Sequence, residues 1–86
     1  MIASLLKMTG PRDDEMFKRF IATTPGVVAS YQLQSPDNPN DVAVFTVWED
    51  EKAREAFNAS AQRAEVDKKY PDGSRTIYRV LNSKGG

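Results

Sequence analysis

The segment from Val42 to Trp48 constrains the fold more than any other stretch of this chain. Its seven residues comprise six apolar side chains and one threonine, and it ends in the only tryptophan. A strand with one face in water alternates apolar and polar side chains, and this segment does not. We therefore expect protein to cover both faces of this strand.

Three further segments read as strands. Val27 to Gln34 alternates cleanly, with Tyr31 on the same side as Val27 and Ala29. A loop rich in Pro, Asp and Asn joins it to the next strand and predicts a hairpin with a long connection. The predicted strands are Ile2 to Met8, Val27 to Gln34, Val42 to Trp48 and Arg75 to Leu81, and residues 82–86 are predicted to form a frayed tail.

The first predicted helix lies between the first two strands. Thr9 or Gly10 is its expected cap, Pro11 lies in its first turn, and Pro25-Gly26 ends it. The acidic residues 13–15 come directly after this start, near the N-terminus of the helix, where the helix dipole favours carboxylates. We therefore interpret them as a feature of the helix and not as a metal site. The apolar stripe consists of Met16, Phe17, Phe20 and Ile21.

The second predicted helix follows the two-faced strand. Asp50 is its expected cap, and Asn58-Ala59-Ser60 is expected to divide it into two segments. Its inner stripe is narrow and made mostly of small side chains, which would leave room for a ligand beside the helix. That stripe is Ala53, Ala56, Phe57, Ser60, Ala61 and Ala64.

The order β-α-β-β-α-β predicts one ferredoxin-like α+β domain over residues 1–86. Right-handed crossovers place both helices on one face of a four-stranded antiparallel sheet. The other face would carry the second apolar side of Val42 to Trp48, and such a face usually marks an association surface. A homodimer that packs its two sheets face to face would cover it.

Composition excludes several classes of function. The chain has 12 basic and 12 acidic residues, so it lacks the positive charge of a nucleic-acid-binding protein. It has no cysteine and no histidine, which removes thiolate chemistry, the commonest metal ligand and the commonest general base. No apolar run is long enough to span a membrane, and the N-terminus does not resemble a signal peptide, so we expect a cytoplasmic protein without metal or cofactor.

Three stretches resemble the antibiotic biosynthesis monooxygenase family of dimeric α+β barrels. Thr24-Pro25-Gly26-Val27-Val28 is similar to the Pro-Gly entry into the family's second strand, and residues 35–41 are similar to its hairpin loop. The most recognisable stretch runs from Val44 to Ala53 and leads to Phe57. The resemblance implies a homodimer through the sheets. It also implies a cofactor-free oxygenase, a haem-degrading enzyme, a quinol oxygenase or a protein without known activity. The missing histidine argues against haem chemistry.

Six residues are candidates for the site. Trp48 either packs the seam between sheet and helices or lines a pocket there with its indole N–H as a donor, and packing is the commoner role. Tyr31 is expected on the more apolar side of its strand, where it either lines the same space or packs in the core with a partner for its hydroxyl. Arg79, on the opposite side of its strand from Tyr78, either makes a salt bridge in the dimer interface or binds an anion. The predicted catalytic residues are Trp48, Tyr31 and Arg79, and the predicted ligand contacts are Trp48, Tyr31, Thr46, Phe57 and Phe20.

Two functions remain open at this point. The first is a cofactor-independent monooxygenase acting on a small electron-rich aromatic compound of the polyketide or quinol type, whose own anion would react with oxygen. The second is a binding or accessory protein that uses the same pocket without catalysis. A fold of this kind hosts both, so the sequence leaves open whether the protein is an enzyme.

Overall fold

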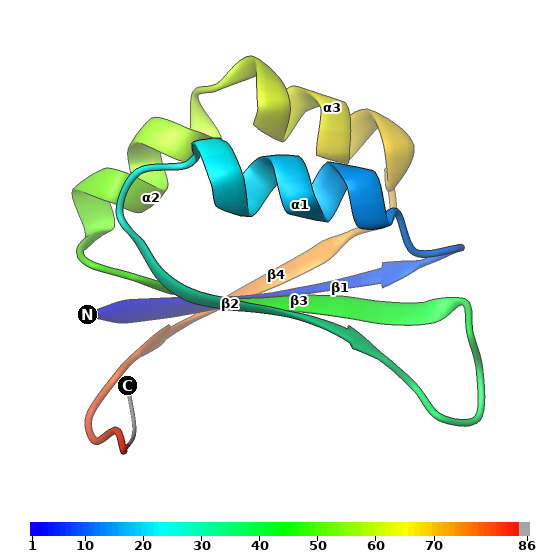
Figure 1. Ribbon diagram of the computed structural model, residues 1–86, viewed down its shortest axis with the longest axis horizontal. Coiled ribbons are helices and arrows are strands. Elements are labelled where there is room, and N and C mark those ends of the chain that lie inside the picture. Colours follow the sequence, from blue (N-terminus) through cyan, green and yellow to red (C-terminus); the bar gives the residue numbers. More distant parts are fainter. Residues whose placement is uncertain (85–86) are drawn as a thin grey trace.

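A computed structural model describes residues 1–84 and shows a four-stranded sheet with all the helices on one face (Figure 1). This is the predicted ferredoxin-like α+β architecture. The division of the second helix into two segments is also confirmed, with Ser60 capping the second of them. The elements are β1 (Ile2–Thr9), α1 (Asp14–Thr23), β2 (Val27–Gln34), β3 (Asp41–Trp48), α2 (Glu51–Asn58), α3 (Ala61–Lys69) and β4 (Ser74–Arg79).

The strand order is β2-β3-β1-β4, and every neighbouring pair is antiparallel. Paired residues lie on the same face, so the register defines rows that cross the whole sheet. Two rows on the helix side are Gln32–Val44–Leu6–Arg75 and Ser30–Thr46–Ser4–Ile77. Two rows on the opposite side are Tyr31–Phe45–Leu5–Thr76 and Ala29–Val47–Ala3–Tyr78.

The side of the sheet turned away from the helices is mostly apolar, and we call it the open face, defined by these last two rows. Tyr31 and Tyr78 are both about half exposed there. Strand β3 contributes Phe45 and Val47 to this face and Val44 and Trp48 to the helix side. Its sequence is apolar at nearly every position because both of its faces carry apolar side chains. Within residues 1–84, only the helix side is covered by the chain itself.

Helix α1 begins later than predicted. Its cap is Asp13, whose carboxylate accepts a hydrogen bond from the backbone N–H of Met16 at 2.9 Å, so Thr9, Gly10 and Pro11 precede the helix. An aspartate satisfies the first turn better than glycine does, and Asp13 is three residues before Met16, the spacing that an N-cap requires. The predicted cap Asp50 is correct and accepts from Ala53 N–H.

Strand β4 is shorter than predicted. It ends at Arg79, and only the N–H of Val80 continues toward β1, donating to the carbonyl of Met1 at 3.2 Å. Strand β1 begins at Ile2, so β4 has no partner for residues beyond Val80. Residues 82–84 form no helix or strand, and 85–86, the end of the predicted tail, lie outside the described residues.

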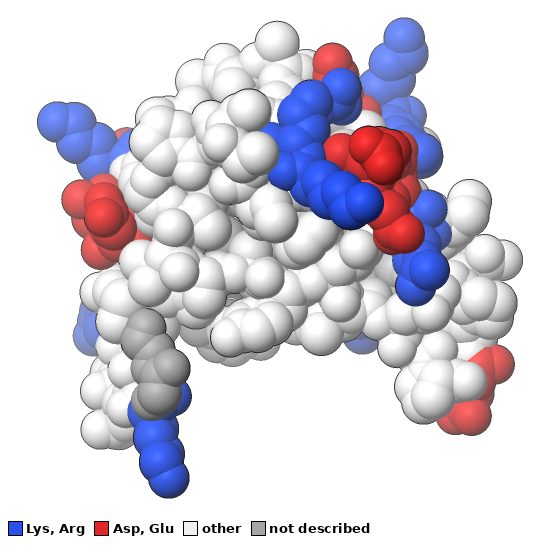
Figure 2. All heavy atoms as spheres, viewed as in Figure 1, with Lys and Arg blue, Asp and Glu red and all other residues white. Residues whose placement is uncertain are grey.

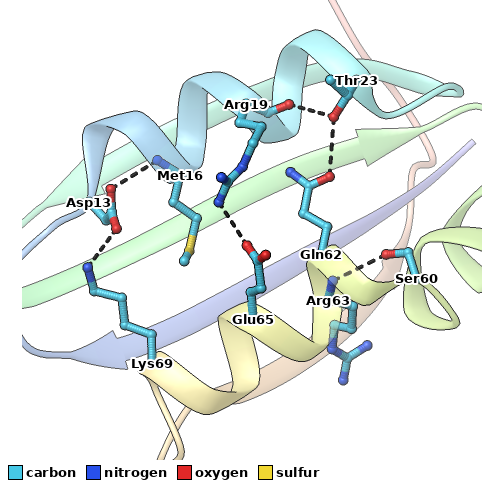
Figure 3. Close-up of polar contacts among 9 residues, drawn as sticks. All are labelled: Asp13, Met16, Arg19, Thr23, Ser60, Gln62, Arg63, Glu65 and Lys69. Carbon is cyan, nitrogen blue, oxygen red and sulfur yellow. Dashed lines mark hydrogen bonds and ion pairs between the residues drawn. The ribbon is translucent and has the colours of Figure 1, made fainter.

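Helices α1 and α3 lie side by side and are joined by polar side chains (Figure 3). Lys69 Nζ contacts Asp13 at 2.6 Å, and Arg19 contacts Glu65 at 2.8 Å. Figure 2 shows oppositely charged groups next to one another over this helical layer. Exposed pairs of this kind each contribute about 0–1 kcal/mol, so the apolar side chains below them carry most of the packing energy.

Candidate functional site

An apolar cavity lies between the sheet and the helices, with a volume of about 90 Å3. Its walls come from all four strands and from α1, α2 and α3. Most of the lining is aliphatic or aromatic, with a few polar groups among it. The polar side chains in the lining are Ser4, Arg12, Asp13, Gln32, Thr46, Tyr70 and Arg75.

Three aromatic rings fill one end of this space. The ring of Phe20, on α1, lies 6.0 Å from that of Trp48 and 5.0 Å from that of Phe57, both nearly edge to face. Trp48 is only 2% exposed, and its ring lies 5.7 Å from Phe57. Edge-to-face pairs of this kind add about 0.5–1.5 kcal/mol to area burial, so the cluster anchors α1 and α2 on β3.

The indole of Trp48 has a partner inside the protein. Its Nε1–H donates to the hydroxyl of Ser4 at 3.1 Å, across the β1–β3 pair. Within residues 1–84, the Ser4 hydroxyl has no other hydrogen-bond partner, so its own proton is free to be donated. Thr46, in the same row, is tied to Ser30 with 2.9 Å between the two hydroxyl oxygens. One hydroxyl of that pair donates to the other, whereas Ser4 accepts from the indole and keeps its own proton for a ligand.

Arg75 brings a positive charge to the cavity wall. Its side chain is 23% exposed, and Nη1 lies 3.0 Å from Oδ1 of Asp67. Burial and the neighbouring Arg63 lower the pKa of Arg75, and the contact with Asp67 opposes this. Asp67 also accepts from Nε of Arg63 at 3.2 Å. Burial raises the pKa of Asp67, but the hydrogen bonds from the two arginines outweigh it and leave that pKa below its usual value.

Tyr70 and Asp13 close the cavity near the start of α1. The hydroxyl of Tyr70 donates to the carbonyl of Pro11 at 2.7 Å, and burial raises its pKa. Hydrogen bonds from Lys69 and from the N–H of Met16 lower the pKa of Asp13. Asp13 is the only carboxylate in the described lining. Its low pKa makes it a weak base, and Tyr70 stays protonated at neutral pH.

Four of the six predicted site residues meet at the cavity: Trp48, Thr46, Phe57 and Phe20. Tyr31 does not, which corrects the prediction that it shares a space with Trp48. Val27 pairs with Trp48, but Ala29 pairs with Val47, so one extra residue enters β2 between them. This β-bulge moves Tyr31 to the open face, where it pairs with Phe45 and is 57% exposed.

Arg79 is also absent from the cavity lining. It pairs with Ile2 at the end of the edge strand, on the helix side of the sheet and not on the open face. The register therefore places Arg79 outside the open face, and its predicted salt bridge in the dimer interface stays a prediction. Tyr78 occupies the open face instead, opposite Ala3.

Sequence reasoning missed Ser4, Arg75 and Tyr70. Ser4 is a lone hydroxyl in an apolar strand and Arg75 stands at the start of one, so neither forms a motif. Once the antiparallel register is set, however, Ser4 lies opposite Thr46 and Arg75 opposite Leu6. These two residues could thus have been found from the strand pairing, but not from any local sequence pattern.

A second, more open hollow of about 370 Å3 lies beside the small residues of α2. Ala53 and Ala56 line it together with Gly26 and Phe57, so the small-residue stripe does leave room, in a hollow next to the aromatic cluster. The described part of the chain has no group of three or more acidic side chains placed to hold a metal ion. None of its helices is long and apolar enough to cross a membrane.

The family model for antibiotic biosynthesis monooxygenase matches residues 14–69. This chain belongs to that family. The matched region runs from α1 through α3 and includes Phe20, Trp48 and Phe57, the three rings of the cluster. No match was found among curated proteins.

Solved structures agree with this fold. SnoaB, a cofactor-independent oxygenase from Streptomyces nogalater, is 18% identical with a TM-score of 0.76, over 95% of this chain and 94% of that one. Rv0793 from Mycobacterium tuberculosis is 12% identical with a TM-score of 0.74, over 99% of this chain and 100% of that one. A conserved protein from Methanosarcina mazei Go1 is 15% identical with a TM-score of 0.70, over 92% of each chain.

Proposed function

We propose that this family member is a cofactor-independent monooxygenase acting on a small electron-rich aromatic compound of the quinol or polyketide type. The observation that carries the proposal is the Ser4 hydroxyl, which is held by Trp48 and lines a mostly apolar cavity. Family membership and the SnoaB-like fold agree with it.

The reaction needs no reductant from the protein. A phenol or anthrone-type substrate loses a proton, and its carbanion-like form passes an electron to O2. The two radicals combine through a new C–O bond, and the resulting hydroperoxide loses water by breaking its O–O bond. A CH2 group and O2 thus become a carbonyl group and water, with one oxygen atom in each product.

The protein's part is to bind the substrate, exclude water and stabilise its anion. The free proton of Ser4 can be donated to a phenolate oxygen, and Arg75 supplies positive charge at the wall. Proton removal relies mainly on the substrate's own acidity, because the chain has no histidine and Asp13 has a lowered pKa.

The cavity limits the size of the substrate. Ligand pockets usually measure about 300–1,000 Å3, and this one holds about 90 Å3. A single ring is therefore the largest group that fits without displacement of the flexible Met8 and Met16 side chains in its wall.

The second candidate is a binding or accessory protein without catalysis. The same small volume favours it, as does the indole N–H of Trp48, which already has a partner. This candidate needs only the apolar cavity and makes no use of the Ser4 proton.

We also propose a homodimer in which two open faces pack together. The sheet is about 19 Å wide and 26 Å long from strand spacing and rise, or about 500 Å2 per copy. Two copies would bury about 1,000 Å2, near the lower limit for a specific interface. The half-exposed Tyr31 and Tyr78 supply the large side chains that such interfaces favour.

Oxygen uptake by purified, metal-free protein tests the catalytic proposal. The substrates are a hydroquinone, a dihydroxynaphthalene and an anthrone, which are all electron-rich and increase in size, and mass analysis of the products distinguishes oxygen insertion from simple oxidation to a quinone. We expect uptake above the buffer rate, and a loss of about tenfold or more in Ser4→Ala and Trp48→Phe, since each removes the oriented donor. Arg79→Gln, outside the cavity, is the matched control.

Two outcomes would end the catalytic proposal. One is a wild-type rate equal to that of buffer for all substrates. The other is an equal rate in wild type, Ser4→Ala and the control. In either case, ligand-induced changes in Trp48 fluorescence would decide whether the binding function is kept.

A further inference from the structure

The geometry points to an anion site at Arg75, so that the ligand of this cavity is a single-ring aromatic acid with its carboxylate on the guanidinium. This inference rests on the proposed function, because it assumes that the cavity between sheet and helices is the ligand site. It adds the chemical class of that ligand. It concerns a residue that lies outside the segment matched by the family model.

The position of Arg75 is set by the sheet. It pairs with Leu6 in the row that continues through Val44 to Gln32, all on the helix side. β4 is an edge strand and the Arg75 side chain keeps some contact with solvent, so Arg75 stands at the border of the cavity. An apolar ring lying over Leu6 and Val44 would direct a substituent toward the guanidinium.

The charges around Arg75 are unbalanced. Arg63 and Arg75 share a single carboxylate, that of Asp67. The other cations near the cavity each have their own carboxylate: Lys69 pairs with Asp13, and Arg12 with Asp14. One positive charge therefore remains without a counter-charge at this border of the cavity.

The guanidinium of Arg75 also has spare donors. It carries five N–H groups, and Asp67 is its only polar partner within residues 1–84. A planar carboxylate matches the fork of an arginine and binds it through two hydrogen bonds, whereas a neutral amide offers a single acceptor. Burial makes the positive charge less stable in this position, which an incoming anion would relieve.

Benzoate and benzamide are the probes, because they have nearly the same shape and differ in charge. Neither can take part in the phenol oxidation proposed above, so the result is independent of oxygenase activity. Binding is followed by calorimetry and by the single indole N–H signal that Trp48 gives in nitrogen–proton NMR spectra. We expect benzoate to bind about tenfold or more tightly than benzamide, as for a charge-assisted contact.

Four variants locate the effect. Arg75→Gln should weaken benzoate binding about tenfold and leave benzamide binding unchanged, and Arg75→Lys should restore part of the loss. Asp67→Asn should strengthen benzoate binding, since it releases two guanidinium groups from their shared carboxylate. Arg79→Gln, on the same side of the same strand but outside the cavity lining, should change neither. Thermal melting of each variant confirms that it is folded.

The inference is overturned if benzoate and benzamide bind wild type equally, or if benzoate shows no saturable binding at millimolar concentrations. It is also overturned if Arg75→Gln and Arg79→Gln have equal effects. A benzoate preference together with no oxygen uptake would keep the anion site and remove the oxygenase. Oxygen uptake without a benzoate preference would do the reverse.

Discussion

Phe45 lies in the middle of the open face, paired with Leu5 on one side and Tyr31 on the other. Replacing it with lysine should dissociate the proposed dimer. In the monomer the lysine amine can reach water from this uncovered face. In the dimer two lysines, one from each copy, would be buried between sheets that offer no carboxylate in the rows around them.

The size of the effect follows from the area involved. Full burial of a phenylalanine side chain contributes about 1.5–3 kcal/mol, but Phe45 is already partly buried in the single chain, so dimerisation covers about a third of it and two copies lose about 1–2 kcal/mol. A dimer with a micromolar Kd is held by about 8 kcal/mol, and each 1.4 kcal/mol is a factor of ten. Phe45→Lys should therefore raise Kd about tenfold through lost burial, and the cost of the two buried charges raises it further.

Light scattering at micromolar concentrations is the assay. Wild type should give about twice the 9.6 kDa chain mass, and Phe45→Lys should give the chain mass itself. Ile21→Lys is the control, because Ile21 is 46% exposed on α1, on the other side of the sheet. A monomeric wild type, or a dimer in which Phe45→Lys and Ile21→Lys behave alike, would refute this use of the open face.

Two further predictions concern stability. Gly26 has a φ of +83°, and a Cβ added there would overlap Cβ of Ala53, so Gly26→Ala should cost about 2–4 kcal/mol and lower Tm by about 10 °C or more. Adding Ala53→Gly should recover only the overlap part, and an unchanged Tm in Gly26→Ala would contradict the geometry. Lys69 lowers the pKa of Asp13 from 3.8, so the stability this carboxylate adds is present above about pH 4 and lost as pH falls through the lower folded pKa. Acid titrations of unfolding should show this loss in wild type and a smaller one in Lys69→Met. Lys18→Met is the control, and equal curves for the two variants would argue against the α1–α3 pair.

Much of the fold was predictable because it depends on periodic patterns. The alternation in β2, the two-sided run in β3 and the break at Asn58-Ala59-Ser60 all define elements that the structure contains. The errors lie where single residues decide. The sequence pattern places Asp13 in the first turn of α1, whereas in the structure its carboxylate caps that helix. Strand β4 ends where its partner β1 begins, and the sequence of β4 alone does not indicate that position.

The candidate site was predictable in its aromatic part only. Phe20, Phe57 and Trp48 were expected at the seam between sheet and helices, and they form the cluster there. Tyr31 was misplaced because the bulge at Val28 leaves no signature in a run of apolar residues, yet it reverses the faces of every residue after it. A one-residue shift of this kind is decided by strand pairing over the whole sheet.

The two faces of β3 also indicate where function can reside in this molecule. On the helix side, Trp48 and Thr46 are buried, and both already have partners, Ser4 and Ser30. The side chains of β3 thus pack against the neighbouring strands and the helices on one face and against the proposed partner copy on the other. Three other polar groups of the cavity lining keep unused donors: Ser4 on its neighbour β1, Gln32 on β2 and Arg75 on the edge strand β4. Changes in ligand preference within this chain should therefore come from positions 4, 32 and 75, while changes at Trp48 should alter stability together with activity.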